Sequence, residues 1–219
     1  MGKLRRRRSR VKGRQNLDVL GAKGQFFFNL EYWQSLHVRH VLDVMHIEKN
    51  VCESIIGTLL DVSHKSKDGL KSRLDLVDMG IRTTLHPRVG EKKTYLPPSN
   101  YTLTKDEKIM FCERLTKLKV PDGYSSNLSN CVSMKELKLF GMKSHDYHTL
   151  MQQILPVILW GLLDKTVRST ITRVCLFFNS LCSKVVDASS LRNIQEELTT
   201  IMCLLEKYFH HHFLTLWSI

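Results

Sequence analysis

The fold of this 219-residue chain is decided by the stretch from Leu42 to Leu60, which reads LDVMHIEKNVCESIIGTLL. At about 100° per residue, an α-helix gathers the apolar side chains of this stretch on one broad arc. The arc carries Val44, Val51, Cys52, Ile55, Ile56 and Leu59. The opposite side carries Asp43, His46, Asn50, Glu53 and Ser54. The pattern predicts an amphipathic helix with one face in a core and one polar stripe.

Helix signals continue along the rest of the chain. A short helix over residues 68–79 is expected to stop at Gly80, and capping patterns open further helices at Thr104, Ser133 and Ser144. These four helices are expected over residues 68–79, 104–118, 133–141 and 145–161, with a kink at Pro156. Two more follow over residues 164–184 and from Ser189 or Ser190 to Tyr208. Only residues 25–30 suggest a strand, so we expect a mainly α fold built as a helical bundle.

Residues 82–100 contain His86-Pro87, Gly90 and Pro97-Pro98 with little periodicity. Such a composition is typical of a linker or an extended surface segment. We place a domain boundary there, between residues 26–100 and a helical domain over residues 101–219.

The charge is concentrated at the N-terminus. Eight of the net twelve positive charges precede the first acid, Asp18, and they are Lys3, Arg5, Arg6, Arg7, Arg8, Arg10, Lys12 and Arg14. A run of like charges repels itself and has nothing to bury, so residues 1–25 are expected to form a disordered basic arm. The arm would bind DNA phosphates weakly or act as a nuclear import signal; a basic tail without a role is the alternative.

No apolar run follows these charges, which argues against a signal peptide. The longest apolar stretch, residues 154–163, is about half of what a bilayer requires. We expect no membrane partner.

The six cysteines form no CxxC pair, so most are expected to be buried, reduced thiols. The absence of a CxxC pair also argues against zinc binding. Three adjacent histidines, His210 to His212, point in different directions on a helix and do not predict a metal site.

The residues with most chemical content are Asp43, His46 and Glu48. Asp43 and His46 are neighbours on a helix face, where a carboxylate can orient an imidazole or share a divalent metal; a solvated polar face is the alternative. Glu48 falls on the apolar arc, where a carboxylate must be paired, bind a metal or lie at a protein seam, unless the helix begins later. Asp146, between His145 and His148, is explained as a helix cap. A phosphate-binding Gly-rich loop and a GxSxG elbow are absent from the sequence.

Several segments resemble the transposase of plant CACTA (En/Spm-type) elements. They are residues 26–33 (FFFNLEYW), 37–40 (HVRH), 42–51 (LDVMHIEKNV), 56–60 (IGTLL), 67–76 (KDGLKSRLDL), 95–98 (YLPP), 120–127 (VPDGYSSN) and 142–146 (MKSHD). The likeness runs from about Phe26 to Phe209, covering the C-terminal end of the transposase domain and the helical domain of unknown function that follows it.

The resemblance implies an RNase H-like DDE/D enzyme, in which three carboxylates hold two metal ions such as Mg²⁺. The first two acids should lie upstream of this sequence, so residues 26–100 are expected to be an incomplete remnant of that core. Asp43, His46 and Glu48 are then candidate remnants of the site, and the partner of Glu48 would lie in the missing part.

We therefore expect a catalytically inactive nuclear fragment without a cofactor, which retains weak DNA binding and has full-length transposase as a second candidate partner. A helical protein-interaction module is one alternative. An active metal-dependent nuclease, using acids such as Asp146 or Glu206, is the other.

The resemblance also bears on the last residues. The family continues after Phe209 with Pro-Pro-Ser-Phe-Phe-Asp-Ile-Met-Val-His, and deleting one base from codons for that string yields the sequence of residues 210–219 found here. We interpret this end as a one-base frameshift, to be checked on genomic DNA.

Overall fold

The computed structural model describes residues 43–91, 93–119 and 128–209. Three expectations concern residues outside these ranges: the basic arm with Lys3 to Arg14, the strand over residues 25–30 and the histidines at 210–212. They remain predictions, as does the RNase H-like remnant at the N-terminal side.

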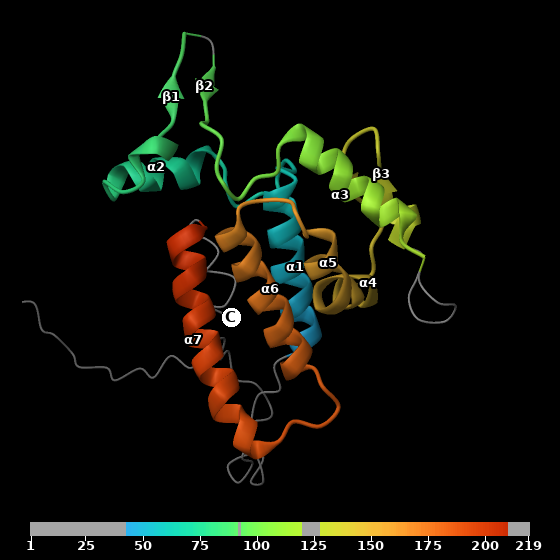
Figure 1. Ribbon diagram of the computed structural model, residues 1–219. Coiled ribbons are helices and arrows are strands. Elements are labelled where there is room, and N and C mark those ends of the chain that lie inside the picture. Colours follow the sequence, from blue (N-terminus) through green and yellow to red (C-terminus); the bar gives the residue numbers. More distant parts are fainter. Residues whose placement is uncertain (1–42, 92, 120–127, 210–219) are drawn as a thin grey trace, which may run out of the picture. The chain divides into compact units, whose positions relative to one another are not determined.

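The described part of the chain is mainly α-helical, as the sequence predicts (Figure 1). Its helices are α1 (Val44–Leu59), α2 (Leu70–Asp78), α3 (Lys105–Lys117), α4 (Ser144–Thr149), α5 (Leu155–Ile158), α6 (Lys165–Leu181) and α7 (Leu191–Tyr208). Shorter turns of helix are η3 (Thr83–Leu85), η4 (Leu128–Cys131), η5 (Leu150–Ile154) and η6 (Ala188–Ser190). Two small antiparallel hairpins pair β1 (Arg88–Val89) with β2 (Thr94–Tyr95) and β3 (Val132–Ser133) with β4 (Lys138–Leu139).

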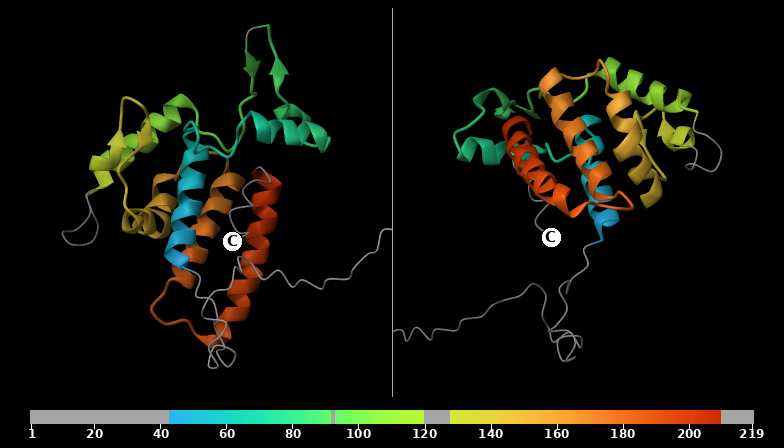
Figure 2. Two further views of the ribbon diagram at one scale, coloured as in Figure 1. Left: turned by 180° about the vertical axis from the view of Figure 1, so that it is seen from behind. Right: turned by 60° about the horizontal axis from the view of Figure 1, so that its bottom comes forward.

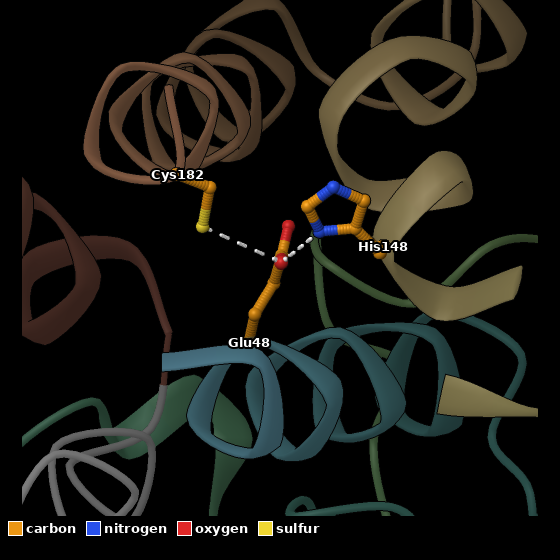
Figure 3. Close-up of side chains that lie close together, drawn as sticks. All are labelled: Glu48, His148 and Cys182. Carbon is orange, nitrogen blue, oxygen red and sulfur yellow. Dashed lines mark hydrogen bonds and ion pairs between the residues drawn. The ribbon is translucent and has the colours of Figure 1, made fainter. Parts of the chain in front are cut away.

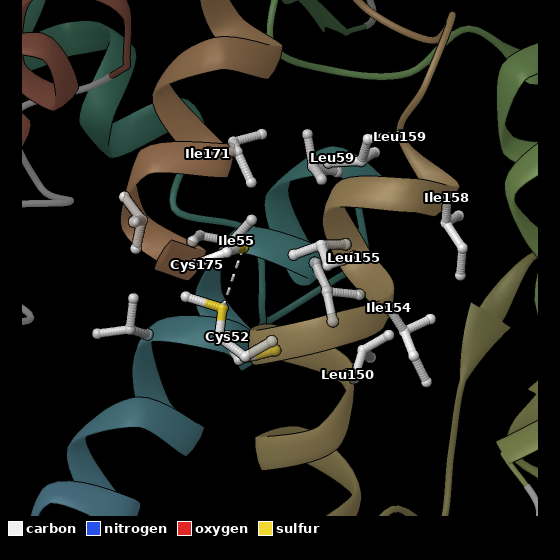
Figure 4. Close-up of a cluster of buried hydrophobic side chains, with 14 of the residues drawn as sticks. Cys52, Ile55, Leu59, Leu150, Ile154, Leu155, Ile158, Leu159, Ile171 and Cys175 are labelled. Carbon is white, nitrogen blue, oxygen red and sulfur yellow. Dashed lines mark hydrogen bonds between the residues drawn. The ribbon is translucent and has the colours of Figure 1, made fainter. Parts of the chain in front are cut away.

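Helix α1 supplies one wall of the core. Val51, Cys52, Ile55, Ile56 and Leu59 of the predicted arc are all buried. Of these, Cys52, Ile55 and Leu59 pack among side chains of η5, α5 and α6, as Figure 4 shows. α1 lies against α4, and α6 lies between the η5–α5 segment and α7. Residues on both sides of the boundary expected near residue 100 contribute to this core.

The helix expected over residues 145–161 is interrupted. It consists of α4, the π-helical turn η5 and α5, with Pro156 near the start of α5. Proline has no N–H to donate and its ring displaces the carbonyl four residues earlier, so a wider turn ahead of it accommodates the ring. The expected irregularity at Pro156 therefore takes the form of a π-helical turn.

Helices α6 and α7 lie side by side in both views of Figure 2. Arg173 of α6 joins Glu197 of α7 through two hydrogen bonds, Nε to Oε1 at 2.7 Å and the second guanidinium nitrogen to Oε2 at 2.8 Å. Phe209, just after α7, is buried and stacks on Tyr101 with ring centroids 5.4 Å apart. These contacts hold the C-terminal helix on the bundle.

Helix α2 forms where expected but turns its apolar stripe outward. Leu70, Leu74 and Val77 are 44%, 48% and 42% exposed, whereas Arg73 is 2% exposed. The guanidinium of Arg73 is held by the carboxylate of Asp68 and by the carbonyl oxygens of Leu85 and Pro97, at 2.9 and 3.2 Å.

Several predicted helix ends are confirmed. Thr104 and Glu107 form a capping box at α3, and Asp164 caps α6 by accepting from the N–H of Thr166. Gly80 has a φ of +67° and ends α2 with a hydrogen bond from the N–H of Ile81 to the carbonyl of Leu76.

The prediction of a helix over residues 133–141 is wrong. This segment forms the β3–β4 hairpin, in which Val132 pairs with Leu139. The N–H of Glu136 does donate to the Ser133 hydroxyl at 3.3 Å, as in a helix cap, but Leu137 adopts a φ of +49° and reverses the chain. A left-handed residue ends any helical path at that point.

The segment expected to be a linker or an extended surface segment, residues 82–100, contains η3 and the β1–β2 hairpin. In the described ranges, every helix is too short or too polar to cross a lipid bilayer.

Candidate functional site

Glu48 lies in the second turn of α1, on the side that faces the core. Asp43 starts this helix by accepting a hydrogen bond from the N–H of His46 at 3.1 Å. The helical register then places the Glu48 side chain in line with Val51 and Cys52, and it is completely buried. The alternative that α1 begins after Glu48 is therefore wrong.

Three helices meet at the Glu48 carboxylate (Figure 3). Oε2 of Glu48 lies 2.7 Å from Nδ1 of His148 in α4 and 3.8 Å from Sγ of Cys182 at the C-cap of α6. We call Glu48, His148 and Cys182 the Glu48 cluster. Its three ligand atoms, an oxygen, a nitrogen and a sulfur, lie within 4.8 Å of one another.

His148 and Cys182, the two partners of Glu48, are positioned by hydrogen bonds at the start of α4 and the end of α6. Asp146 accepts from the N–H of Lys143 at 2.8 Å, which fixes the first turn of α4 and so the direction of His148. The N–H of Cys182 donates to the carbonyl of Phe178 at 2.9 Å and closes the last turn of α6. Gln152 of η5 contacts both His148 and the last turn of α6. Its Nε2 lies 3.1 Å from Nδ1 of His148 and 3.4 Å from the carbonyl of Phe178.

The cluster is not arranged as a cysteine nucleophile. Burial and the charge of Glu48 raise the pKa of Cys182 to about 11, whereas a nucleophilic cysteine needs a lowered pKa. Moreover, Nδ1 of His148 is engaged by the Glu48 carboxylate at 2.7 Å, while a Cys-His pair needs the imidazole hydrogen-bonded to the sulfur. Acyl transfer through Cys182 is therefore disfavoured.

One atom of the cluster is unsatisfied. Oε1 of Glu48 is buried and has no hydrogen-bond partner among the described residues. A buried carboxylate oxygen without a donor costs free energy, since it has lost its water and gained no replacement. The geometry therefore allows two chemical uses: an ion pair with a protonated His148 that joins α1 to α4, or coordination of a cation.

The three residues singled out from the sequence do not form one site. Asp43 uses its carboxylate as a helix cap, and His46 is exposed and contributes its backbone N–H to that cap. Glu48 alone of the three points into the core. The expectation that the partner of Glu48 lies in a missing part of an enzyme is wrong, because His148 of this chain is the partner.

Comparisons with protein-family models, with curated proteins and with solved structures find no match.

His148 and Cys182 carry no clear site signal in the sequence. His148 fits the start of a capped helix, and Cys182 lacks a second cysteine at metal-binding spacing. The one available signal is Glu48 itself, whose place on an apolar arc requires a partner. Which residue supplies that partner depends on contacts between positions a hundred residues apart.

Proposed function

We propose that this chain is a non-catalytic helical fragment of a CACTA-type transposase that binds DNA weakly through its basic N-terminal residues. The observation that carries the proposal is the role of the two acids in the segment most similar to that family. Asp43 caps α1, and Glu48 is buried against His148. Both carboxylates therefore serve folding contacts within the chain.

This use of the two acids argues against phosphodiester chemistry. Two-metal catalysis requires several carboxylates that converge on a pair of ions about 4 Å apart. The groups that approach Glu48 within the described ranges are instead an imidazole and a thiol. The candidate acid Asp146 is also engaged, since it accepts a backbone hydrogen bond at the start of α4.

The DNA-binding part of the proposal rests on charge. Eight cations precede Asp18, and only four net positive charges remain for the other residues. Cations that neutralise phosphates release counterions, so binding weakens steeply with salt.

Gel-shift titrations at several salt concentrations test this part. Replacing Arg5, Arg6, Arg7 and Arg8 by glutamine should weaken binding. It should also make the slope of log affinity against log salt concentration less steep by about 0.9 for each phosphate that is no longer neutralised. The matched control replaces four exposed lysines of the body, Lys71, Lys105, Lys135 and Lys165, with the same change in charge. Equal effects of the two variants, or no binding at low salt, would reject the basic arm as the DNA-binding element.

Incubating supercoiled plasmid with the chain and Mg²⁺ or Mn²⁺ tests the absence of catalysis. We expect no nicking beyond that of the Glu48→Gln variant. Metal-dependent nicking that Glu48→Gln abolishes would instead support the nuclease alternative.

A second function, docking on full-length transposase as a protein-interaction module, is favoured by α2. Leu70, Leu74 and Val77 form an apolar stripe at i, i+4 and i+7 that is nearly half exposed. Such a stripe is a common recognition element for a partner helix or groove.

Co-purification with full-length transposase tests this function. Leu74→Glu should abolish capture, while Leu191→Glu, at a similarly exposed leucine of α7, should leave it unchanged. Capture that survives Leu74→Glu would rule out the α2 stripe as the docking surface.

A further inference from the structure

We propose that the Glu48 cluster binds a single zinc ion, with Glu48, His148 and Cys182 as its three protein ligands. The inference goes beyond the proposed function and is compatible with it, because a zinc ion at this place would join three helices of this chain and would not assemble the carboxylate triad of a transposase.

The distances suit a zinc ion after movements of up to about 1 Å, since the His148 nitrogen and the Cys182 sulfur lie within 4.8 Å of each other and would lie about 3.6 Å apart on a tetrahedral ion. With Zn–O and Zn–N bonds near 2.1 Å and a Zn–S bond near 2.3 Å, tetrahedral ligands lie about 3.4 Å apart for oxygen and nitrogen and about 3.6 Å apart for oxygen and sulfur. The Glu48 oxygen and the Cys182 sulfur are 3.8 Å apart, close to this value. The oxygen and the His148 nitrogen are 2.7 Å apart, so they must separate by about 0.7 Å.

A second observation points to a cation at this place. Glu48 is 0% exposed, and its Oε1 has no partner among the described residues. A divalent ion on Oε2 would place a positive charge beside the whole carboxylate, Oε1 included, and so compensate its loss of water.

The His148 ring is also imperfectly satisfied without an ion. Nδ1 faces both Oε2 of Glu48 and the Nε2 amide of Gln152, at 2.7 and 3.1 Å. A single ring nitrogen carries either a proton or a lone pair, so it cannot donate to the carboxylate and accept from the amide together. With an ion in place, the lone pair of Nδ1 would bind the metal next to the carboxylate oxygen, and the Gln152 amide would donate to the carbonyl of Phe178 alone.

The ligand types select zinc over the common hard cations. Mg²⁺ and Ca²⁺ take oxygen ligands, whereas a site with one carboxylate, one imidazole and one thiolate matches the borderline character of Zn²⁺. On binding, the Cys182 thiol would lose its proton to solvent and form the Zn–S bond.

Access to the site is available from one side. The side chain of His148 is 28% exposed and Cys182 is partly exposed, so an ion can reach the buried carboxylate past them. Three protein ligands leave a fourth tetrahedral position, which a water molecule would take.

The test measures zinc binding by calorimetry and cobalt binding by absorption, on full-length protein stripped with a chelator. His210, His211 and His212 are replaced by glutamine in every sample, because adjacent imidazoles also bind these ions. We expect one ion per chain and a thiolate-to-cobalt charge-transfer band. Cys182→Ser should remove the band, and His148→Gln should weaken zinc binding by more than the roughly 100-fold upper range found for outer-shell partners.

Two variants serve as controls. Cys203→Ser and His64→Gln remove an exposed thiol and an exposed imidazole outside the cluster, and both should keep the affinity within about twofold, as for independent sites. A missing thiolate-to-cobalt band, or an affinity that His148→Gln does not change, would overturn the proposal.

Alkylation of the wild-type protein decides the question even where a variant fails to fold. Zinc should protect Cys182 from iodoacetamide and leave the labelling of Cys203 unchanged, as read by mass spectrometry. Equal labelling of Cys182 with and without zinc, after an exposure long enough to modify Cys182 in the metal-free protein, would also overturn the site.

Discussion

The carboxylate of Glu48 and the imidazole of His148 are separated by a hundred positions in sequence and lie 2.7 Å apart. This contact joins α1 to α4 from within the core, because the Glu48 side chain is completely buried. The pair therefore connects two distant parts of the chain in a way that no local motif could.

Replacing His148 by leucine should lower the free energy of unfolding by about 1–3 kcal/mol, since Glu48 would remain buried without its donor. Urea unfolding measured in a chelator checks this without interference from metal. The double variant Glu48→Leu/His148→Leu should recover part of the loss, because an apolar pair carries no desolvation cost. A comparable loss in His46→Leu, at an exposed histidine of α1, would contradict the assignment.

Asp43→Ala should cost about 1 kcal/mol of stability, whereas Asp43→Asn should be nearly neutral. The reason is that Asp43 acts as the N-cap of α1, and an asparagine side chain can accept the same hydrogen bond from the N–H of His46. Thermal or urea unfolding distinguishes the two variants. A metal-binding or catalytic carboxylate would show the opposite pattern, with function lost in Asp43→Asn at unchanged stability.

Local features of this fold could be predicted because they depend on residues close in sequence. The Thr104–Glu107 capping box, the Asp164 cap and the left-handed Gly80 each involve residues within six positions. The Ser133–Glu136 pattern shows where this reasoning fails. The same hydrogen bond that caps a helix also closes a turn, and the left-handed Leu137 decides between them.

For long-range features, the sequence predicts that a contact is needed but not which residue makes it. The position of Glu48 on an apolar arc correctly demands a partner, but His148 and Cys182 reach it through the packing of α4 and α6 on α1. Likewise, the periodicity of α2 predicts the helix and not its buried face. That face is set by Arg73, whose guanidinium is drawn inward by carbonyls of the following segment.

Arg73→Met should destabilise the protein by about 3–5 kcal/mol, because it leaves Asp68 largely buried and unpaired. Arg73→Lys should recover little, since an ammonium cannot reproduce the fork that reaches Asp68 and two carbonyl oxygens. Lys71→Met, at an exposed position of the same helix, is the control and should change stability by less than about 0.5 kcal/mol. Urea unfolding curves of the three variants give the comparison.

Thiol labelling of the metal-free native protein should be selective. Cys203 is exposed, whereas burial raises the pKa of Cys112 and Cys182 to about 11, and Cys52 and Cys175 are fully buried. We expect iodoacetamide to modify Cys203 at least about tenfold faster than these four buried or partly buried cysteines, because alkylation needs an accessible thiolate. Peptide mass spectrometry over time gives the rates, and urea should remove the difference. Fast labelling of Cys175 in the native protein would contradict the packing of α6.

The contact between α6 and α7 should weaken in acid. The hydrogen bonds from Arg173 hold the pKa of Glu197 below its ordinary value of 4.5. A carboxyl whose pKa is lower in the folded state stabilises the fold above its unfolded pKa, and this contribution disappears as the pH falls through the folded pKa. Both side chains are more than a third exposed, so the contribution is screened and should be at most about 1 kcal/mol. Unfolding of wild type and Glu197→Gln, compared above and below pH 4.5, should show a difference that vanishes in acid. The neighbouring Glu196→Gln variant, at an exposed position of α7, should show no such pH-dependent difference.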